Sequence, residues 1–151
     1  MSRHLLSISH SVQEESAGCL AACAQMVMSY LGIDRTQAEL NRLLGLTSIG
    51  TPYRNIVRLA SYGLTVSLQA GTENDLRSAV DANTPPILFL MTGDLPYWQD
   101  NTSHAVVLIG YDETMVMIAD PVFPTSPQLA TWDELLLAWG EQDCAYAIVT
   151  R

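Results

Sequence analysis

A cysteine and a histidine stand where each could take part in acyl-transfer chemistry. Cys19 follows Ser16-Ala17-Gly18 and opens an apolar pattern with helical spacing. The partial positive charge at a helix N-terminus stabilises a thiolate, and small neighbouring residues would let a substrate backbone approach. The alternative is a buried cysteine that packs as a small hydrophobe, which is what most cysteines do. His104 precedes the apolar run 105–109, a rigid element suited to holding a general base. Its alternative is a histidine merely tolerated at the end of a strand.

Asp120 adds a carboxylate at a matching position. It follows the apolar run 115–119 and precedes Pro121. If the runs 105–109 and 115–119 pair as a hairpin, the start of one lies beside the end of the other. Asp120 would then lie next to His104, where a carboxylate could fix the imidazole tautomer and stabilise the imidazolium. The simpler interpretation is that Asp-Pro is favourable turn chemistry.

Gln13 lies six residues before Cys19 and could donate a hydrogen bond to the oxyanion formed on an attacked carbonyl. The alternative is an ordinary surface glutamine. Cys23 and Cys144 are interpreted as packing residues. Because no second pair of ligands stands at zinc-like spacing, we expect no structural zinc site. The sequence contains no phosphate-loop, flavin or nicotinamide fingerprint, so we expect no cofactor.

The elements that must position these residues divide the chain into a helical half and a sheet half. Together they predict an α+β layout in a single domain, 1–151. We expect helices over 19–31, from 34 or 36 to 44, from 52 to 62, after a Thr72 cap, and from a Thr131 cap to 139. Ile56, Val57, Leu59 and Ala60 should line the buried face of the third helix. We expect strands over 64–68, 86–91, 105–109, 115–119 and 145–150.

Composition narrows the classes of protein and partner. Of the 151 residues, 48% are hydrophobic, which excludes an intrinsically disordered chain. The net charge of −9 disfavours nucleic acid and membrane as partners and suggests a substrate with basic or neutral residues near the reacting bond. Three cysteines and no signal-peptide pattern predict a cytoplasmic protein. All seven basic residues are arginine, which an arginine-biased genome would explain.

Taken jointly, the two motifs resemble those of the double-glycine-leader cysteine peptidases and their wider relatives, the family-thirty-nine-like peptidases of the papain fold. The resemblance runs from about residue 5 to 150. The chain departs from the family pattern at one position, because the residue after the cysteine is often glycine in the family and is Leu20 here. The matching segments are Gln13 to Val27 around Cys19, Tyr30-Leu31-Gly32, Leu95-Pro96-Tyr97-Trp98, His104-Ala105-Val106-Val107, Asp120-Pro121 and Trp132 to Trp139.

This resemblance implies a papain-like fold in which Cys19, at the start of a helix, faces His104 on the sheet. It implies that Cys19 is the nucleophile, His104 the general base and acid, Asp120 the residue that orients the histidine, and Gln13 the oxyanion-hole donor. The implied substrate is a peptide or protein. Relatives attached to bacteriocin exporters cut after paired glycines. This chain looks like a standalone bacterial form, for which we expect a processing peptidase that cuts after small residues.

Two further function classes stay open. The same thioester would serve an isopeptidase or an acyl transferase, because only the acceptor differs. A degenerate peptidase domain that binds peptides without cutting them is the rival from another class. The presence of all four site residues favours an enzyme. The sequence predicts neither the substrate nor the oligomeric state.

Overall fold

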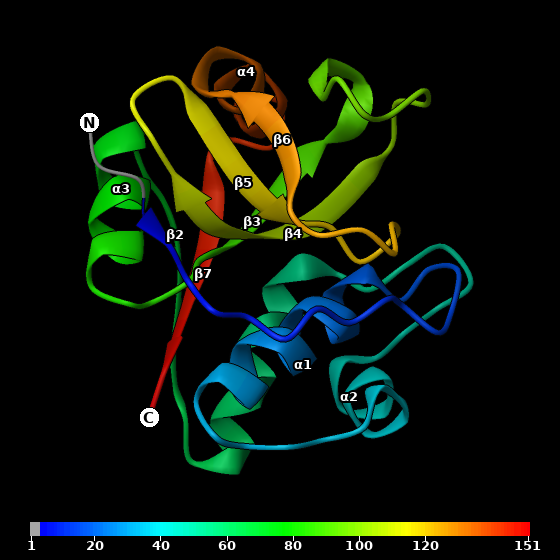
Figure 1. The fold of residues 1–151 in the computed structure, drawn as a ribbon. Coiled ribbons are helices and arrows are strands. Elements are labelled where there is room, and N and C mark those ends of the chain that lie inside the picture. The colour runs from blue at the N-terminus through cyan, green and yellow to red at the C-terminus, as the bar shows by residue number, and fades with distance from the viewer. Residues whose placement is uncertain (1–3) are drawn as a thin grey trace.

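A computed structural model describes residues 4–151, which are arranged as a central sheet with helices on both faces (Figure 1). The strands are β1 (His4–Leu5), β2 (Thr65–Ala70), β3 (Ile87–Met91), β4 (Ser103–Tyr111), β5 (Met115–Ala119), β6 (Gln128–Thr131) and β7 (Ala145–Thr150). They form one antiparallel sheet in the order β2-β7-β3-β4-β5-β6, with β1 paired to β4.

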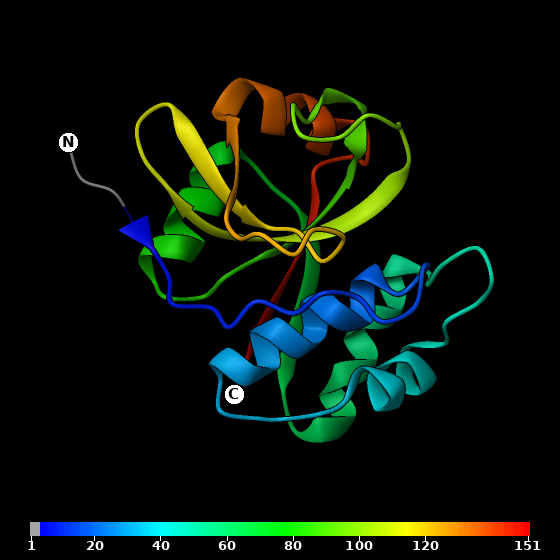
Figure 2. The same ribbon diagram turned by 45° about the vertical axis from the view of Figure 1, so that its right-hand side comes forward.

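The helices form two groups. The α-helices are α1 (Cys19–Tyr30), α2 (Gln37–Leu44), α3 (Glu73–Asp81) and α4 (Trp132–Gly140), and the 3-10 helices are η1 (Tyr53–Tyr62) and η2 (Thr92–Asp94). α1, α2 and η1 form a layer below the sheet, whereas α3 and α4 lie on its other side (Figure 2). Within residues 4–151, no helix is both long and apolar enough to cross a bilayer.

Burial on both faces explains the continuous apolar runs of the central strands. Along β4, Ala105, Val107 and Ile109 pack with the α1 layer, and the alternating Val106 and Leu108 pack with α3 and α4. Side chains alternate between the faces of a strand, so a strand covered on both sides must be apolar throughout. The expected helix-then-sheet layout is confirmed, and the helices sandwich the sheet.

The predicted helix caps are confirmed. The side chains of Thr36, Thr72 and Thr131 each accept a hydrogen bond from the backbone N–H three residues further on. The carboxylate of that later residue in turn accepts a hydrogen bond from the backbone N–H of the threonine. Gly45 ends α2 and Gly63 ends η1, both in the left-handed conformation that glycine adopts without a Cβ penalty. These local signals fix the helix ends before any packing is considered.

The buried face of the third helix differs from the prediction. Ile56 and Leu59 are buried, but Val57 is 46% exposed and Ala60 also faces solvent. The helix η1 is a 3-10 helix, whose side chains repeat every three residues, so residues three apart share one face. The sequence pattern also missed the short strands β1 and β6.

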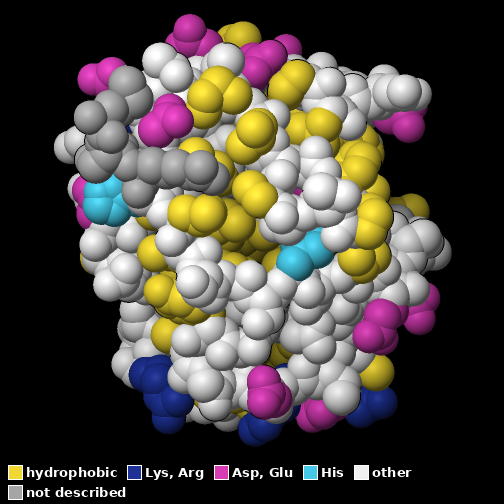
Figure 3. All heavy atoms as spheres, viewed as in Figure 1, with side chains coloured by type: hydrophobic (Ala, Val, Ile, Leu, Met, Phe, Trp, Pro, Cys, Tyr) yellow, Lys and Arg dark blue, Asp and Glu magenta, His cyan; other side chains and the backbone are white. Residues whose placement is uncertain are grey.

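Charge is divided unevenly between the two halves of the chain. Residues 73–151 contain twelve of the sixteen acidic residues and two of the seven arginines, for a formal charge of −10, and residues 1–72 carry +1. Figure 3 shows the arginine side chains gathered along the lower edge, over the helical layer. The sheet half therefore carries the acidic character of the protein.

Candidate active site

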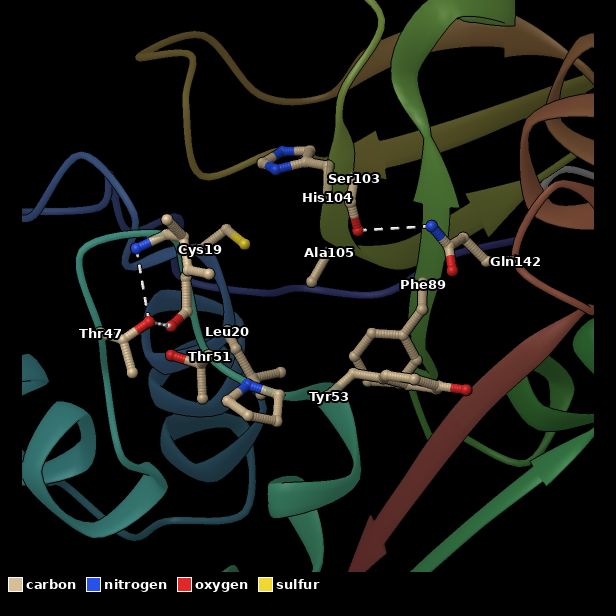
Figure 4. Close-up of a pocket in the computed structure, with 13 residues that line it drawn as sticks. Cys19, Leu20, Thr47, Thr51, Tyr53, Phe89, Ser103, His104, Ala105 and Gln142 are labelled. Atoms are coloured by element: carbon tan, nitrogen blue, oxygen red, sulfur yellow. Dashed lines mark hydrogen bonds between the residues drawn. The ribbon is translucent and has the colours of Figure 1, made fainter.

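Cys19 is the first residue of α1 and is partly exposed. Its helix begins after Gly18 with no side-chain cap and no acidic residue in the first turn. The amides of that turn are therefore free of the side-chain acceptors that cap α2, α3 and α4, and they keep their attraction for a negative charge. In Figure 4 the Cys19 sulfur points toward the space below the His104 ring.

His104 lies near the start of β4 and is 7% exposed. Its Nε2 atom lies 2.8 Å from Oδ1 of Asp120, which directly follows β5. Val107 pairs with Ala119, so Asp120, the next residue, lies near the start of β4, where His104 stands. The adjacency expected from the hairpin is present, and Nδ1 is the ring nitrogen left for Cys19.

Asp120 is fully buried and its carboxylate is held from several sides. Tyr97 Oη and Trp98 Nε1 each donate to Oδ2 at 2.9 Å, and the Val122 backbone N–H donates to Oδ1 at 3.0 Å. A buried carboxylate with this many donors is stable as an anion. Tyr97 and Trp98 come from the segment between β3 and β4, so three separate parts of the chain fix the position of Asp120.

The electrostatics of the pair favour a charged histidine. Burial alone would lower the pKa of His104, but its hydrogen bonds with Asp120 and Cys19 and the charges of both groups raise that pKa to about 9. Burial opposes ionisation of Asp120 too, yet the hydrogen bond and charge of His104 bring the Asp120 pKa below its usual value. Burial and the Asp120 charge raise the pKa of Tyr97, so its hydroxyl remains a donor.

The other two cysteines differ in setting from Cys19. Cys23 lies one turn further along α1 with no solvent exposure, and burial, together with the charges of Cys19 and Asp120, raises the pKa of its thiol. Cys144 is partly exposed just before β7. Cys23 packs in the core between α1 and the sheet, as expected from the sequence.

Gln13 lies in the segment that leads to Cys19, but its amide faces the main chain. Nε2 donates to the carbonyl oxygens of Glu15, at 3.1 Å, and Ser16, at 2.8 Å, and Oε1 is buried with no hydrogen-bond partner in the described chain. The Gln13 backbone N–H donates to the Pro121 carbonyl at 2.8 Å. Gln13 thus ties the approach to Cys19 to the loop after Asp120, and its oxyanion role stays a prediction.

Cys19 and His104 open onto a pocket of about 450 Å³ between the helical layer and the sheet (Figure 4). The loop between α2 and η1 forms one wall, and Tyr53 and Phe89 form an aromatic wall with ring centroids 4.8 Å apart. Ser103 and Gln142 lie on the sheet side. In the described part of the chain, no cluster of three or more histidine, cysteine or acidic side chains is arranged to hold a metal ion.

Sequence reasoning missed how Asp120 is held and which residues line the pocket. Tyr97 and Trp98 were visible as a Pro-Tyr-Trp run before His104, but nothing local shows that they reach Asp120. The pocket is lined by residues from five separate segments of the chain, and its one local signal is Ile49, an apolar residue inside the turn-forming run 47–52.

Comparison with known proteins identifies the family of this chain. The chain matches the model of the peptidase C39-like family over residues 5–146, and it belongs to that family. An uncharacterized protein of Methanothermobacter thermautotrophicus is 34% identical over 111 residues, which are 73% of this chain and 69% of that protein.

Solved structures show the same fold. A candidate C39-like peptidase from Bacillus anthracis superposes with a TM-score of 0.82 at 17% identity, covering 100% of this chain and 98% of that one. A double-glycine-motif protease from an AMS/PCAT transporter, in complex with its leader peptide, gives 0.77 at 18% identity and coverages of 99% and 96%. The peptidase domain of Streptococcus ComA gives 0.76 at 17% identity, with 93% and 96% covered. The fold is therefore that of the papain-like C39 peptidases.

Proposed function

We propose that the protein is a cysteine peptidase that hydrolyses a peptide bond through a thioester on Cys19. The observation that carries this proposal is the placement of Cys19, at an uncapped helix N-terminus, beside a histidine whose far nitrogen is held by the buried Asp120. Membership of the C39-like family and a pocket that opens on both reacting residues support it.

In the proposed reaction, His104 holds the thiol proton of Cys19 as an imidazolium, and the thiolate sulfur attacks the peptide carbonyl carbon. The negative charge on the carbonyl oxygen is stabilised by the Cys19 backbone N–H at the start of α1. The C–N bond then breaks, and His104 returns its proton to the leaving amine. Water attacks the thioester with His104 as base, which releases the acid and restores the thiol.

His104 and Asp120 together suit the step in which the leaving amine is protonated. A pKa of about 9 keeps the imidazolium available at neutral pH to protonate the amine, and Asp120 stabilises that cation while it holds the ring in place. The proposal includes Gln13 as a second oxyanion donor. For this role its amide must exchange the carbonyls of Glu15 and Ser16 for the substrate oxyanion.

The test is hydrolysis of a peptide library followed by mass spectrometry, comparing the wild type with Cys19→Ala. We expect Cys19→Ala to lose turnover completely while keeping the wild-type circular dichroism spectrum and unfolding midpoint. Cys144→Ala is the matched control, because it also removes a partly exposed thiol, and it should cleave at the wild-type rate. Undiminished cleavage by Cys19→Ala would remove Cys19 from the mechanism.

A further inference from the structure

The pocket beside the catalytic pair has the size and lining of a site for a side chain. Its volume of about 450 Å³ lies within the range of roughly 300–1,000 Å³ that is typical of ligand pockets. Cys19 and His104 form one side of it, so whatever fills the pocket lies next to the bond being cut. Glycine has no side chain and would leave the whole volume to water.

The lining of the pocket is mainly apolar. Tyr53 and Phe89 meet at a tilt of 57°, and Phe89 is only 5% exposed, so the aromatic wall is backed by the core. Ala105 also faces the pocket and leaves room that a larger side chain would close. On the sheet side, the Gln142 amide donates to the Ser103 hydroxyl at 3.3 Å, so these two polar groups already satisfy each other in part.

An exposed isoleucine at the rim points to the same kind of occupant. Ile49 is 96% exposed and borders the pocket. The turn that carries it is closed by backbone bonds in both directions between Thr47 and Gly50, and the Thr47 hydroxyl donates to the Gly50 carbonyl at 2.7 Å. The turn therefore holds an apolar side chain out in water at the mouth of an apolar pocket.

We propose that this pocket binds a large apolar side chain of the substrate, Leu, Met, Phe or Tyr, carried by a residue within two positions of the scissile bond. Tyr53 and Phe89 contact that side chain, and Ile49 covers it from the rim. The pocket thus selects against substrates with only small residues around the cut. A small residue directly at the scissile bond is compatible when its neighbour fills the pocket.

This inference rests on the proposed peptidase activity for its main readout, which is the alignment of cleavage sites from a random peptide library. We expect one of the four positions around the cut to be enriched in large apolar residues, by about tenfold or more over glycine. Tyr53→Ala, which removes half of the aromatic wall, should abolish most of this enrichment. Val57→Ala is the matched control, because Val57 is an exposed apolar residue of η1 outside the pocket lining.

Ile49→Ser provides a second variant that cannot disturb the core, since the side chain is exposed. It should raise KM for peptides with a large apolar residue. Cleavage confined to glycine, alanine and serine at all four positions, or enrichment that survives Tyr53→Ala, would overturn the pocket proposal while leaving the peptidase proposal intact.

Absence of any cleavage would instead count against the peptidase proposal, and binding would then decide the role of the pocket. The same library is passed over immobilised Cys19→Ala protein and the retained peptides are sequenced. Retention of peptides with large apolar residues, lost in the Cys19→Ala/Tyr53→Ala double variant, supports the pocket assignment. Retention without that preference, or no retention, contradicts it.

Discussion

Asp120 keeps its charge without contact with solvent because donors surround it. Tyr97, Trp98, His104 and Val122 all supply hydrogen bonds to its two oxygens. The charge of Asp120 in turn affects His104. The hydrogen bond and charge of Asp120 help to raise the His104 pKa to about 9, although burial alone would lower it. The role proposed for Asp120, which is to position His104, can therefore be measured on the histidine ring.

Asp120→Asn should lower the pKa of His104 by about one to three units, because an opposite charge that favours the imidazolium is removed. The measurement is the titration of the His104 ring protons by NMR, with a midpoint near 9 expected for the wild type. Asp94→Asn, which removes an exposed carboxylate, is the control and should leave the midpoint in place. An unchanged midpoint in Asp120→Asn would show that the ring does not depend on this carboxylate.

The same pair makes the stability of the wild type depend on pH in a defined direction. The His104 pKa is raised in the folded state, so its contribution is present below the ordinary value of about 6.5 and is lost as the pH rises through about 9. The Asp120 pKa is lowered, so its contribution is present above its ordinary range and is lost as the pH falls through the folded value. The wild type should therefore exceed Asp120→Asn in free energy of unfolding by less at high pH, above about 9, and by less at low pH, where Asp120 is protonated.

The segment between β3 and β4, residues 92–102, acts as a bracket, by which we mean that it holds the Asp120 carboxylate in place. Buried Thr92 anchors its base: the Thr92 hydroxyl donates to the Asp100 carbonyl at 2.6 Å and accepts from the Thr102 N–H at 3.0 Å. The closed segment then presents Tyr97 and Trp98 to the carboxylate. The ring of Trp98 also packs edge-on against His104, with ring centroids 5.0 Å apart.

Trp98→Phe keeps an aromatic ring but removes the donor to Asp120. We expect a loss of about 1.5–3 kcal/mol in the free energy of unfolding, the range for a hydrogen bond to a charged group, together with reduced kcat. Trp132→Phe is the matched comparison, since Trp132 Nε1 donates only to the neutral backbone carbonyl of Asp112, and it should leave kcat unchanged. Urea unfolding and peptide hydrolysis would measure both effects, and equal kcat in the two variants would contradict the bracket role.

The complete site exists only because the helical layer packs against the sheet. Cys19 belongs to α1 and His104 to β4, and the segment before α1 is pinned across the sheet by the bonds of Leu6 N–H to Ile109 O and Gln13 N–H to Pro121 O. The pocket opens along the same junction. Neither layer alone presents both Cys19 and His104.

Much of this arrangement follows from local signals in the sequence. The apolar spacing after Cys19, the Thr caps and the hairpin between β4 and β5 are all set within a few residues of each other, so pattern and turn chemistry were enough to predict them. Pairing within that hairpin brings His104 and Asp120 into contact, although they are sixteen positions apart in the sequence. Local reasoning therefore sufficed for that pair.

The remaining features depend on packing between distant segments. Because η1 is a 3-10 helix, Val57 and Ala60 are exposed to solvent. The prediction that they are buried assumed the 3.6-residue period of an α-helix. Strands as short as β1 and β6 have too few residues to show alternation. The donors to Asp120 and the pocket walls are assembled across the chain, so no local pattern identifies them.

The most direct measurement is the rate at which iodoacetamide alkylates each cysteine of the native protein, followed by peptide mass spectrometry. If the fold brings Cys19 and His104 together as a nucleophile and its base, Cys19 should react at least about tenfold faster than the similarly exposed Cys144, while buried Cys23 is protected. This advantage should vanish in His104→Ala and in denaturing urea. Equal rates at Cys19 and Cys144, or an advantage that persists in His104→Ala, would contradict a Cys19–His104 catalytic pair.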